Sequence, residues 1–100
     1  MLTSGVEVDG IFACSDMFAM AAIRTLGEAG FKVPGDVALV GYDDFSLAGY
    51  FNPPLTSVRQ DRKQVAEHLV DNVLAAIAGE AQQVQVMDPE LIVRQSSVRC

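Results

Sequence analysis

The chain is poor in basic residues. Only 7 of its 100 residues are Lys or Arg, against 13 Asp and Glu, so its formal net charge is -6. The only adjacent basic pair is Arg62-Lys63. A surface that docks on a phosphate backbone needs clustered Lys and Arg side chains. The composition therefore argues against direct contact between this chain and nucleic acid.

Cysteine, histidine and long apolar runs are also scarce. Cys14 and Cys100 are too few for a disulfide framework or a metal knuckle, so a reduced, cytoplasmic setting is expected. No run approaches the roughly 18 apolar residues of a membrane span, and the chain as given carries no secretory signal. There is no glycine-rich phosphate loop and no His-based triad. We expect no membrane partner, metal, cofactor or catalytic residue.

What is present suffices for one compact α/β domain with a modest core, since half of the residues are hydrophobic. Its central feature is residues 37–40, an apolar run that ends abruptly in Gly41, Tyr42, Asp43 and Asp44. A short apolar run bounded by turn signals is typical of a buried parallel strand. Ligands bind beyond the carboxyl ends of such strands, so the two aspartates lie where a site is normally built.

The same pattern occurs twice more. Residues 10–14 are an apolar, β-capable run and residues 55–58 are an extended piece, and both also end in polar side chains. If the three strands are parallel neighbours, one edge of the sheet carries Ser15, Asp16, Asp43, Asp44, Arg59 and Gln60. Carboxylates accept hydrogen bonds from hydroxyl groups, and an amide both donates and accepts. This set of side chains suits a neutral, polyhydroxylated or otherwise polar ligand.

A helix is predicted from Asp16 to Ala29. Ser15 or Asp16 can cap its first N–H groups, and Gly30 is a natural stop. Residues 17–23 are apolar on nearly every face, so this helix must be covered on more than one side. One side would pack on the sheet, and we expect another to meet a second subunit. The helix and its two flanking strands fit a right-handed βαβ unit.

A second helix is predicted from Asp61 to Ala78, with Gly79 as its stop. One face of it carries an apolar stripe made of Val65, Ala66, Leu69, Val70, Val73, Leu74 and Ile77. Residues 45–52 hold three aromatic residues, which either cover the edge of the core or form an interface. Short strands are expected over residues 84–87 and 91–93.

Four motifs carry a resemblance to a known family. They are residues 9–20 (DGIFACSDMFAM), 33–37 (VPGDV), 40–44 (VGYDD) and 53–60 (PPLTSVRQ). In this order and spacing they resemble the C-terminal part of the lactose-repressor (LacI/GalR) family of bacterial transcription regulators. The resemblance implies the periplasmic-binding-protein type I fold, with a parallel sheet and flanking helices. In that fold two α/β subdomains close on a small ligand, commonly a sugar, and pass the change to a DNA-binding headpiece.

The resemblance also implies roles for individual residues. Asp43 matches the aspartate that contacts effector hydroxyls or amines, and Gln60 falls at the last crossover between subdomains, beside the ligand. Asp16 matches the family's Asp, whereas Ser15 stands where many members have a ligand-contacting Asn. Serine is shorter and has no amide, so the resemblance does not identify the effector. Asp44 is expected to be structural.

The family's dimer-forming surfaces match the helix that starts at Met17 and the aromatic segment that ends in Phe51. Met20 and Tyr50 belong to the same two surfaces, so a homodimer is expected. The family's headpiece, hinge and first subdomain precede the matched part, and the helix from Asp61 would belong to the other subdomain. Residues 1–100 are thus expected to be the C-terminal portion of an effector-binding and dimerisation domain. Alone it would expose apolar surface and self-associate or aggregate.

Alternative interpretations remain open. A sugar-binding transport protein shares the fold, although it would need an upstream signal peptide and the Pro53-Pro54-Leu55-Thr56 segment fits the regulators better. An enzyme or phospho-acceptor could use the paired aspartates to hold Mg²⁺, but Lys is absent from all three strand ends. Asp43 could also be a solvated turn residue, and Ser15 and Asp16 could serve only as helix caps. Four further residues have structural predictions: Cys14 as a small buried hydrophobe, and His68, Arg94 and Arg99 as solvated side chains.

Overall fold

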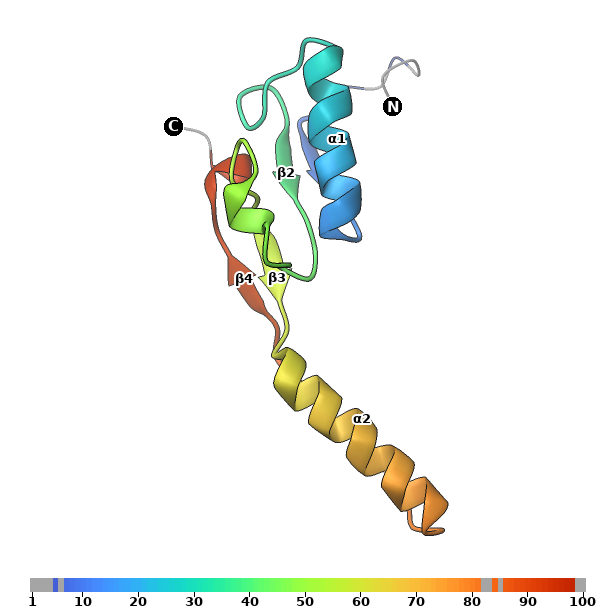
Figure 1. The fold of residues 1–100 in the computed structure, drawn as a ribbon. Helices are drawn as coiled ribbons and strands as arrows, with labels where there is room; N and C mark the ends of the chain where they lie inside the picture. Colours follow the sequence, from blue (N-terminus) through green and yellow to red (C-terminus); the bar gives the residue numbers. More distant parts are fainter. Residues whose placement is uncertain (1–4, 6, 82–83, 85, 99–100) are drawn as a thin grey trace. The chain divides into compact units, whose positions relative to one another are not determined.

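The computed structural model describes residues 5, 7–81, 84 and 86–98 (Figure 1). The elements in chain order are β1 (Gly10–Phe12), α1 (Asp16–Glu28), β2 (Ala38–Val40), η1 (Ala48–Tyr50), β3 (Ser57–Arg59), α2 (Arg62–Ile77), β4 (Glu90–Ile92) and η2 (Gln95–Ser97). They form two compact units: the first runs to Arg59 and resumes at Leu91, and the second is Gln60–Glu90. Neither α1 nor α2, the α-helices of the described part, is long and apolar enough to cross a membrane.

Helix α1 begins and ends where local signals predict. The Ser15 side chain accepts a hydrogen bond from the Phe18 N–H at 3.3 Å, which satisfies one of the otherwise free donors of the first turn. The helix ends at Glu28, and Gly30 follows with a left-handed φ of +87°. The prediction of a helix capped by Ser15 or Asp16 and stopped by glycine is confirmed, and Ser15 is the cap.

The first unit is built on parallel strand pairing. Strands β1 and β2 pair in parallel, with the register Gly10–Ala38, Ile11–Leu39 and Phe12–Val40. Thr56, the residue directly before β3, forms a parallel bridge with Val40 on the other side of β2. The carboxyl ends of three segments therefore meet at one edge, as the sequence predicts. Strand β3 also pairs with β4. The strand predicted over residues 84–87 is wrong at the described residues 84, 86 and 87, which form none.

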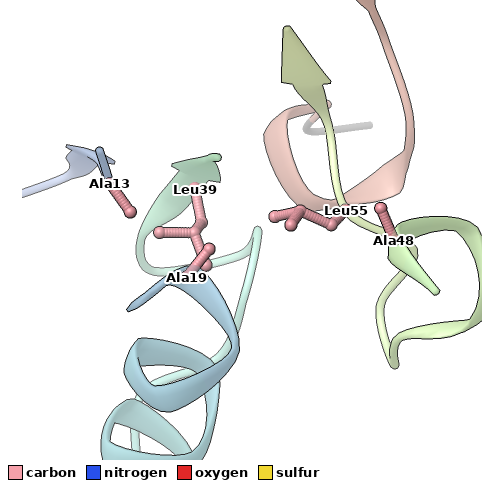
Figure 2. Close-up of a cluster of buried hydrophobic side chains, with 5 residues drawn as sticks. All are labelled: Ala13, Ala19, Leu39, Ala48 and Leu55. Atoms are coloured by element: carbon pink, nitrogen blue, oxygen red, sulfur yellow. The ribbon is translucent and has the colours of Figure 1, made fainter. Parts of the chain in front are cut away.

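The core of the first unit is small and made of small side chains. Its buried cluster consists of Ala13, Ala19, Leu39, Ala48 and Leu55 (Figure 2). Three of the five are alanines, so α1 and η1 can approach the strands closely, and there is little room for any added atom. Phe45 and Phe51 pack edge to face at the border of this cluster, with ring centroids 5.5 Å apart. These two aromatics therefore cover the core edge, whereas Tyr50 is 85% exposed.

Cys14 lies beyond the end of β1 and is exposed. The prediction that it is a buried strand residue is wrong. Strand pairing stops at Phe12, and the buried Ala13 points its side chain into the core. Because successive side chains of an extended chain point to opposite sides, the next residue faces away from that core.

The second unit consists mainly of α2. Asp61 caps it by accepting a hydrogen bond from the Gln64 N–H at 3.1 Å, and Gly79 follows its end with a φ of +75°. The predicted helix is confirmed. None of its residues is buried, and the apolar stripe is exposed at Leu69, Val70, Val73, Leu74 and Ile77. The first four of these line a shallow apolar hollow.

The partly covered face of α2 shares only Val65 with the predicted apolar stripe. Its half-buried residues are Val65, His68, Asn72 and Ala75, which follow one another at spacings of three or four and so share one face. His68 is therefore half-buried instead of solvated, because it lies on this face.

Candidate ligand-binding site

The turn after β2 has an unusual backbone. Asp43 and Asp44 adopt positive φ angles of +100° and +51°. Residues other than glycine rarely do so, although aspartate and asparagine tolerate it better than most. Such conformations persist only where the surrounding structure enforces them, and they are frequent at binding sites. Asp43 is exposed and Asp44 is buried, so the two neighbouring carboxylates occupy opposite environments.

The buried carboxylate of Asp44 is paired with two arginines. Its Oδ2 accepts a hydrogen bond from Arg59 Nε at 2.8 Å, and its Oδ1 accepts one from Arg94 Nη1 at 2.7 Å. The same Arg94 nitrogen donates to the Leu55 carbonyl oxygen at 2.7 Å. A buried charge is costly unless it is paired and hydrogen-bonded, and here both oxygens are. The expected structural role of Asp44 is confirmed.

Arg94 is a correction to the sequence prediction. Its side chain is 21% exposed and joins the Asp44 ion pair, so it is not a solvated arginine. The physical reason is the burial of Asp44, which requires a cation from a distant part of the chain. Arg99, also expected to be solvated, lies outside the described residues.

The pKa of Asp44 reflects opposing influences. Burial raises the pKa of this carboxyl, whereas the hydrogen bonds and charges of Arg94 and Arg59 lower it, and the lowering prevails. A depressed pKa in the folded state stabilises the fold at pH values above the unfolded aspartate pKa of about 3.9. That stabilisation is lost as the pH falls through the lower, folded-state pKa.

We therefore expect acid to weaken the fold partly through Asp44. In urea unfolding of the full-length protein that contains this chain, the midpoint should fall as the pH is lowered below about 4. The urea midpoint of the variant Asp44→Asn should fall less between neutral and acid pH, because this variant lacks the ion pairs at both pH values. The matched control Asp71→Asn removes an exposed carboxylate of α2 and should follow the wild type. If acid lowered the urea midpoint equally in Asp44→Asn and in the wild type, the stabilising role of the Asp44 charge would be contradicted.

Asp16 is held inside the fold. It is 2% exposed; its Oδ1 accepts from Ser57 Oγ at 2.6 Å and its Oδ2 accepts from the Phe45 N–H at 2.8 Å. Ser57 Oγ in turn accepts from the Asp44 N–H at 2.9 Å. Both carboxylate oxygens thus hold the backbone of the turn that contains Asp43 and Asp44, called here the aspartate turn. This geometry gives Asp16 a positioning role, and its ligand contact stays a prediction.

Gly41 makes that arrangement possible. A Cβ atom placed on it would collide with Asp16 Oδ1 and would lie 3.0 Å from Leu55 Cδ2 and 3.4 Å from Ala19 Cβ. Distances this short do not leave room for a methyl group in a close-packed interior. The end of β2 can approach the buried Asp16 carboxylate only because position 41 has no side chain.

The predicted site residues are partly brought together. The Asp16 N–H donates to the Tyr42 carbonyl oxygen at 3.0 Å, so the start of α1, with Ser15, lies beside the end of β2. The Asp43 N–H donates to the Val58 carbonyl oxygen at 2.9 Å, which fixes this turn against β3. Ser15 is half-buried and serves as the α1 cap. Gln60 is exposed and is the first residue of the second unit.

Sequence reasoning missed the buried hydroxyl groups that fasten the C-terminal segment. Ser96 Oγ donates to the Leu39 carbonyl oxygen at 2.6 Å and accepts from the Thr56 N–H at 2.8 Å. Thr56 Oγ1 accepts from the Arg94 N–H at 2.8 Å. Among the described residues, no buried side-chain N or O atom lacks a partner. The available signal was the pair of small hydroxyl residues, Thr56 and Ser57, between the apolar residues Leu55 and Val58.

Comparison with known proteins identifies the family. Residues 3–97 match the model of the periplasmic binding protein-like domain. The chain belongs to this family. The match confirms the predicted α/β fold class, and the parallel β1–β2 pairing with α1 is the part of that fold seen in the first unit.

Within the family, its relatives are LacI-type regulators. The chain is 36% identical over 88 residues to the HTH-type transcriptional repressor PurR of Photobacterium profundum, covering 86% of this chain and 26% of that protein. It is similar to the solved structure of the transcriptional regulator CelR with cellobiose, at 39% identity and a TM-score of 0.82, covering 91% of this chain and 28% of that one.

A third relative is the lac repressor dimer bound to operator and the anti-inducer ONPF. The identity is 31% and the TM-score 0.84, over 99% of this chain and 35% of that one. The predicted LacI/GalR resemblance is confirmed by these relatives, which are transcription regulators and neither enzymes nor transport proteins by name. The chain spans between about a quarter and about a third of the length of these three relatives.

Proposed function

We propose that this chain is the effector-binding and dimerisation portion of a LacI-type transcription regulator. The observation that carries the proposal is the exposed Asp43 carboxylate, held in a left-handed turn at the carboxyl end of a parallel strand. The family membership and the regulators among its relatives support it. DNA would be bound by a headpiece outside this chain, and a regulator of this kind would act in the cytoplasm.

The chemistry of the site favours a neutral sugar or a similar polar metabolite. Asp43 offers carboxylate acceptors, Ser15 a hydroxyl and Gln60 an amide. The two arginines near the turn are already engaged by Asp44. The three aspartates of the site outnumber these two arginines and leave one net negative charge, which disfavours an anionic ligand. The CelR relative was solved with cellobiose, a neutral disaccharide.

A matched ligand series tests this proposal. We expect neutral saccharides, with cellobiose as the first probe, to raise the Tm of the full-length protein, because a ligand that binds only the folded state stabilises it by mass action. The corresponding acid, cellobionate, should raise it much less at equal concentration. A protein stabilised by the acid and not by any neutral saccharide would contradict the proposed ligand class.

Effector action would follow from linkage. A ligand that binds one closure state better than the other shifts their equilibrium by no more than its differential affinity. We propose that residues 60–90 are part of a separate subdomain, which is supported by their grouping as a second compact unit. In the first unit, Asp43 and Ser15 would supply the ligand contacts that favour one closure state.

The dimer surface is the second part of the proposal. Met17 and Met20 on α1 and Tyr50 on η1 are exposed, and apolar and aromatic side chains are enriched at interfaces. Phe51 packs against Phe45 of its own chain and is only half-buried, so part of its ring remains available. The lac repressor relative was solved as a dimer, which supports a homodimer here.

A further inference from the structure

Asp44 connects the candidate ligand-binding turn to both chain segments that lead to and from the second unit. Arg59 is the last residue before the chain enters that unit, and Arg94 follows soon after the chain returns at Leu91. Both arginines pair with the one Asp44 carboxylate, at 2.8 and 2.7 Å. The residue directly before Asp44 is Asp43. One buried carboxylate therefore fastens three separate stretches of chain.

The backbone of the turn is held at three successive points. The N–H groups of Asp43, Asp44 and Phe45 donate to Val58 O, Ser57 Oγ and Asp16 Oδ2, at 2.9, 2.9 and 2.8 Å. Two of these residues have positive φ, a conformation that persists only under such constraint. The Asp44 side chain adds a fourth attachment through its ion pairs with Arg59 of β3 and with Arg94. The direction of the Asp43 carboxylate thus depends on groups that do not themselves face the ligand.

We infer that Asp44 is a positioning residue: through Arg59 and Arg94 it holds Asp43 in its binding conformation and links it to both chain crossings. This inference rests on the proposed function of Asp43, and it assigns Asp44 no contact with ligand. If a bound effector displaced the turn, these ion pairs would change and the chain segments at Arg59 and Arg94 would move. Movement of those two segments would in turn displace Asp43.

The substitution Asp44→Asn tests the inference because asparagine also tolerates a left-handed backbone. It keeps the shape and the preferred φ while it removes the charge that both arginines need. A stability control is Leu26→Ala, which removes a buried side chain ten residues along α1 from Asp16, about 15 Å of helix. A charge control is Glu28→Gln, which breaks the exposed Arg24–Glu28 ion pair of α1.

The first readout is amide hydrogen exchange in the ligand-free, full-length protein. We expect Asp44→Asn to speed exchange at the amides of Asp43, Asp44 and Phe45 by at least about tenfold relative to α1 amides. Leu26→Ala and Glu28→Gln should not speed it selectively at this turn. Adding Arg94→Gln to Asp44→Asn should speed exchange at these three amides little further, because the Asp44–Arg94 ion pair is already broken. Unchanged exchange at the three turn amides in Asp44→Asn would overturn the inference, whatever the ligand proves to be.

The second readout is affinity for the neutral saccharide that most raises the Tm, measured by calorimetry. Asp44→Asn should weaken binding by about tenfold or more, whereas Leu26→Ala should leave it within about twofold although the fold is destabilised. Faster exchange with unaltered affinity would overturn the positioning role. If no neutral saccharide binds the wild type, the proposed sugar ligand fails, and the exchange experiment still decides whether Asp44 holds the turn.

Discussion

Gly41→Ala should destabilise the fold by on the order of 3 kcal/mol, as expected for overpacking of a tight interior combined with displacement of a hydrogen-bonded buried carboxylate. The added methyl group would collide with Asp16 Oδ1 and press on Leu55. Asp16 would have to release Ser57 Oγ or the Phe45 N–H, and both contacts hold the aspartate turn. Urea unfolding of the full-length protein measures the effect.

A second glycine provides the control for that experiment. Gly27 lies inside α1, and a Cβ built on it meets nothing within 4 Å. Gly27→Ala should therefore stabilise the protein by roughly 0.5–1 kcal/mol, because alanine loses less backbone entropy in a helix. If Gly41→Ala proved as stable as the wild type, the close approach of β2 to Asp16 would be wrong.

Asp43→Ala should abolish the effector response of the full-length regulator while leaving operator binding intact. A hydrogen bond to a charged group contributes about 1.5 to 3 kcal/mol, so losing one should weaken effector binding roughly 10- to 150-fold. At effector concentrations near the Kd of the wild type, the response is then largely lost. Titration of effector against operator-bound protein measures both properties in one experiment.

Two further variants separate the carboxylate from its backbone. Alanine is strained at the φ of +100° found at position 43, whereas asparagine tolerates positive φ, so Asp43→Asn isolates the loss of charge. Asp71→Ala removes an exposed carboxylate of α2 and should behave as the wild type. An unchanged response in both position-43 variants would exclude Asp43 from the binding site.

Local signals account for what the sequence predicts well. Ser15 caps α1 and Asp61 caps α2, and Gly30 and Gly79 follow the two helices in the left-handed conformation. Each of these features is decided by residues within a few positions of one another. The meeting of three strand ends is also predicted, because apolar runs that stop in polar residues imply parallel strands with a common edge.

Long-range contacts explain what the sequence does not predict. Asp16 reaches Phe45, 29 positions away, and Arg94 reaches Asp44, 50 positions away. No periodic pattern indicates which of several carboxylates is buried or which arginine will neutralise it. Each of these residues taken alone is typical of a cap, a turn or a solvated surface. Their functions become visible only when the fold brings these residues together.

The apolar surface of α2 illustrates the same limit. The stripe is present in the sequence, but the described residues leave Leu69, Val73 and Ile77 exposed. Burial of a stripe requires a partner layer, which a helix cannot provide for itself. The expected self-association of the isolated chain therefore stays a prediction, and light scattering would measure it directly.

Control of DNA binding by a neutral saccharide is measured by the operator affinity of the full-length protein with and without the saccharide that most raises its Tm. We expect this ligand to change operator affinity at least about fivefold, as allosteric coupling free energies of about 1–3 kcal/mol imply. Tight saccharide binding with no change in operator affinity, or with no DNA binding at all, would contradict this expectation and favour a sugar-binding transport protein.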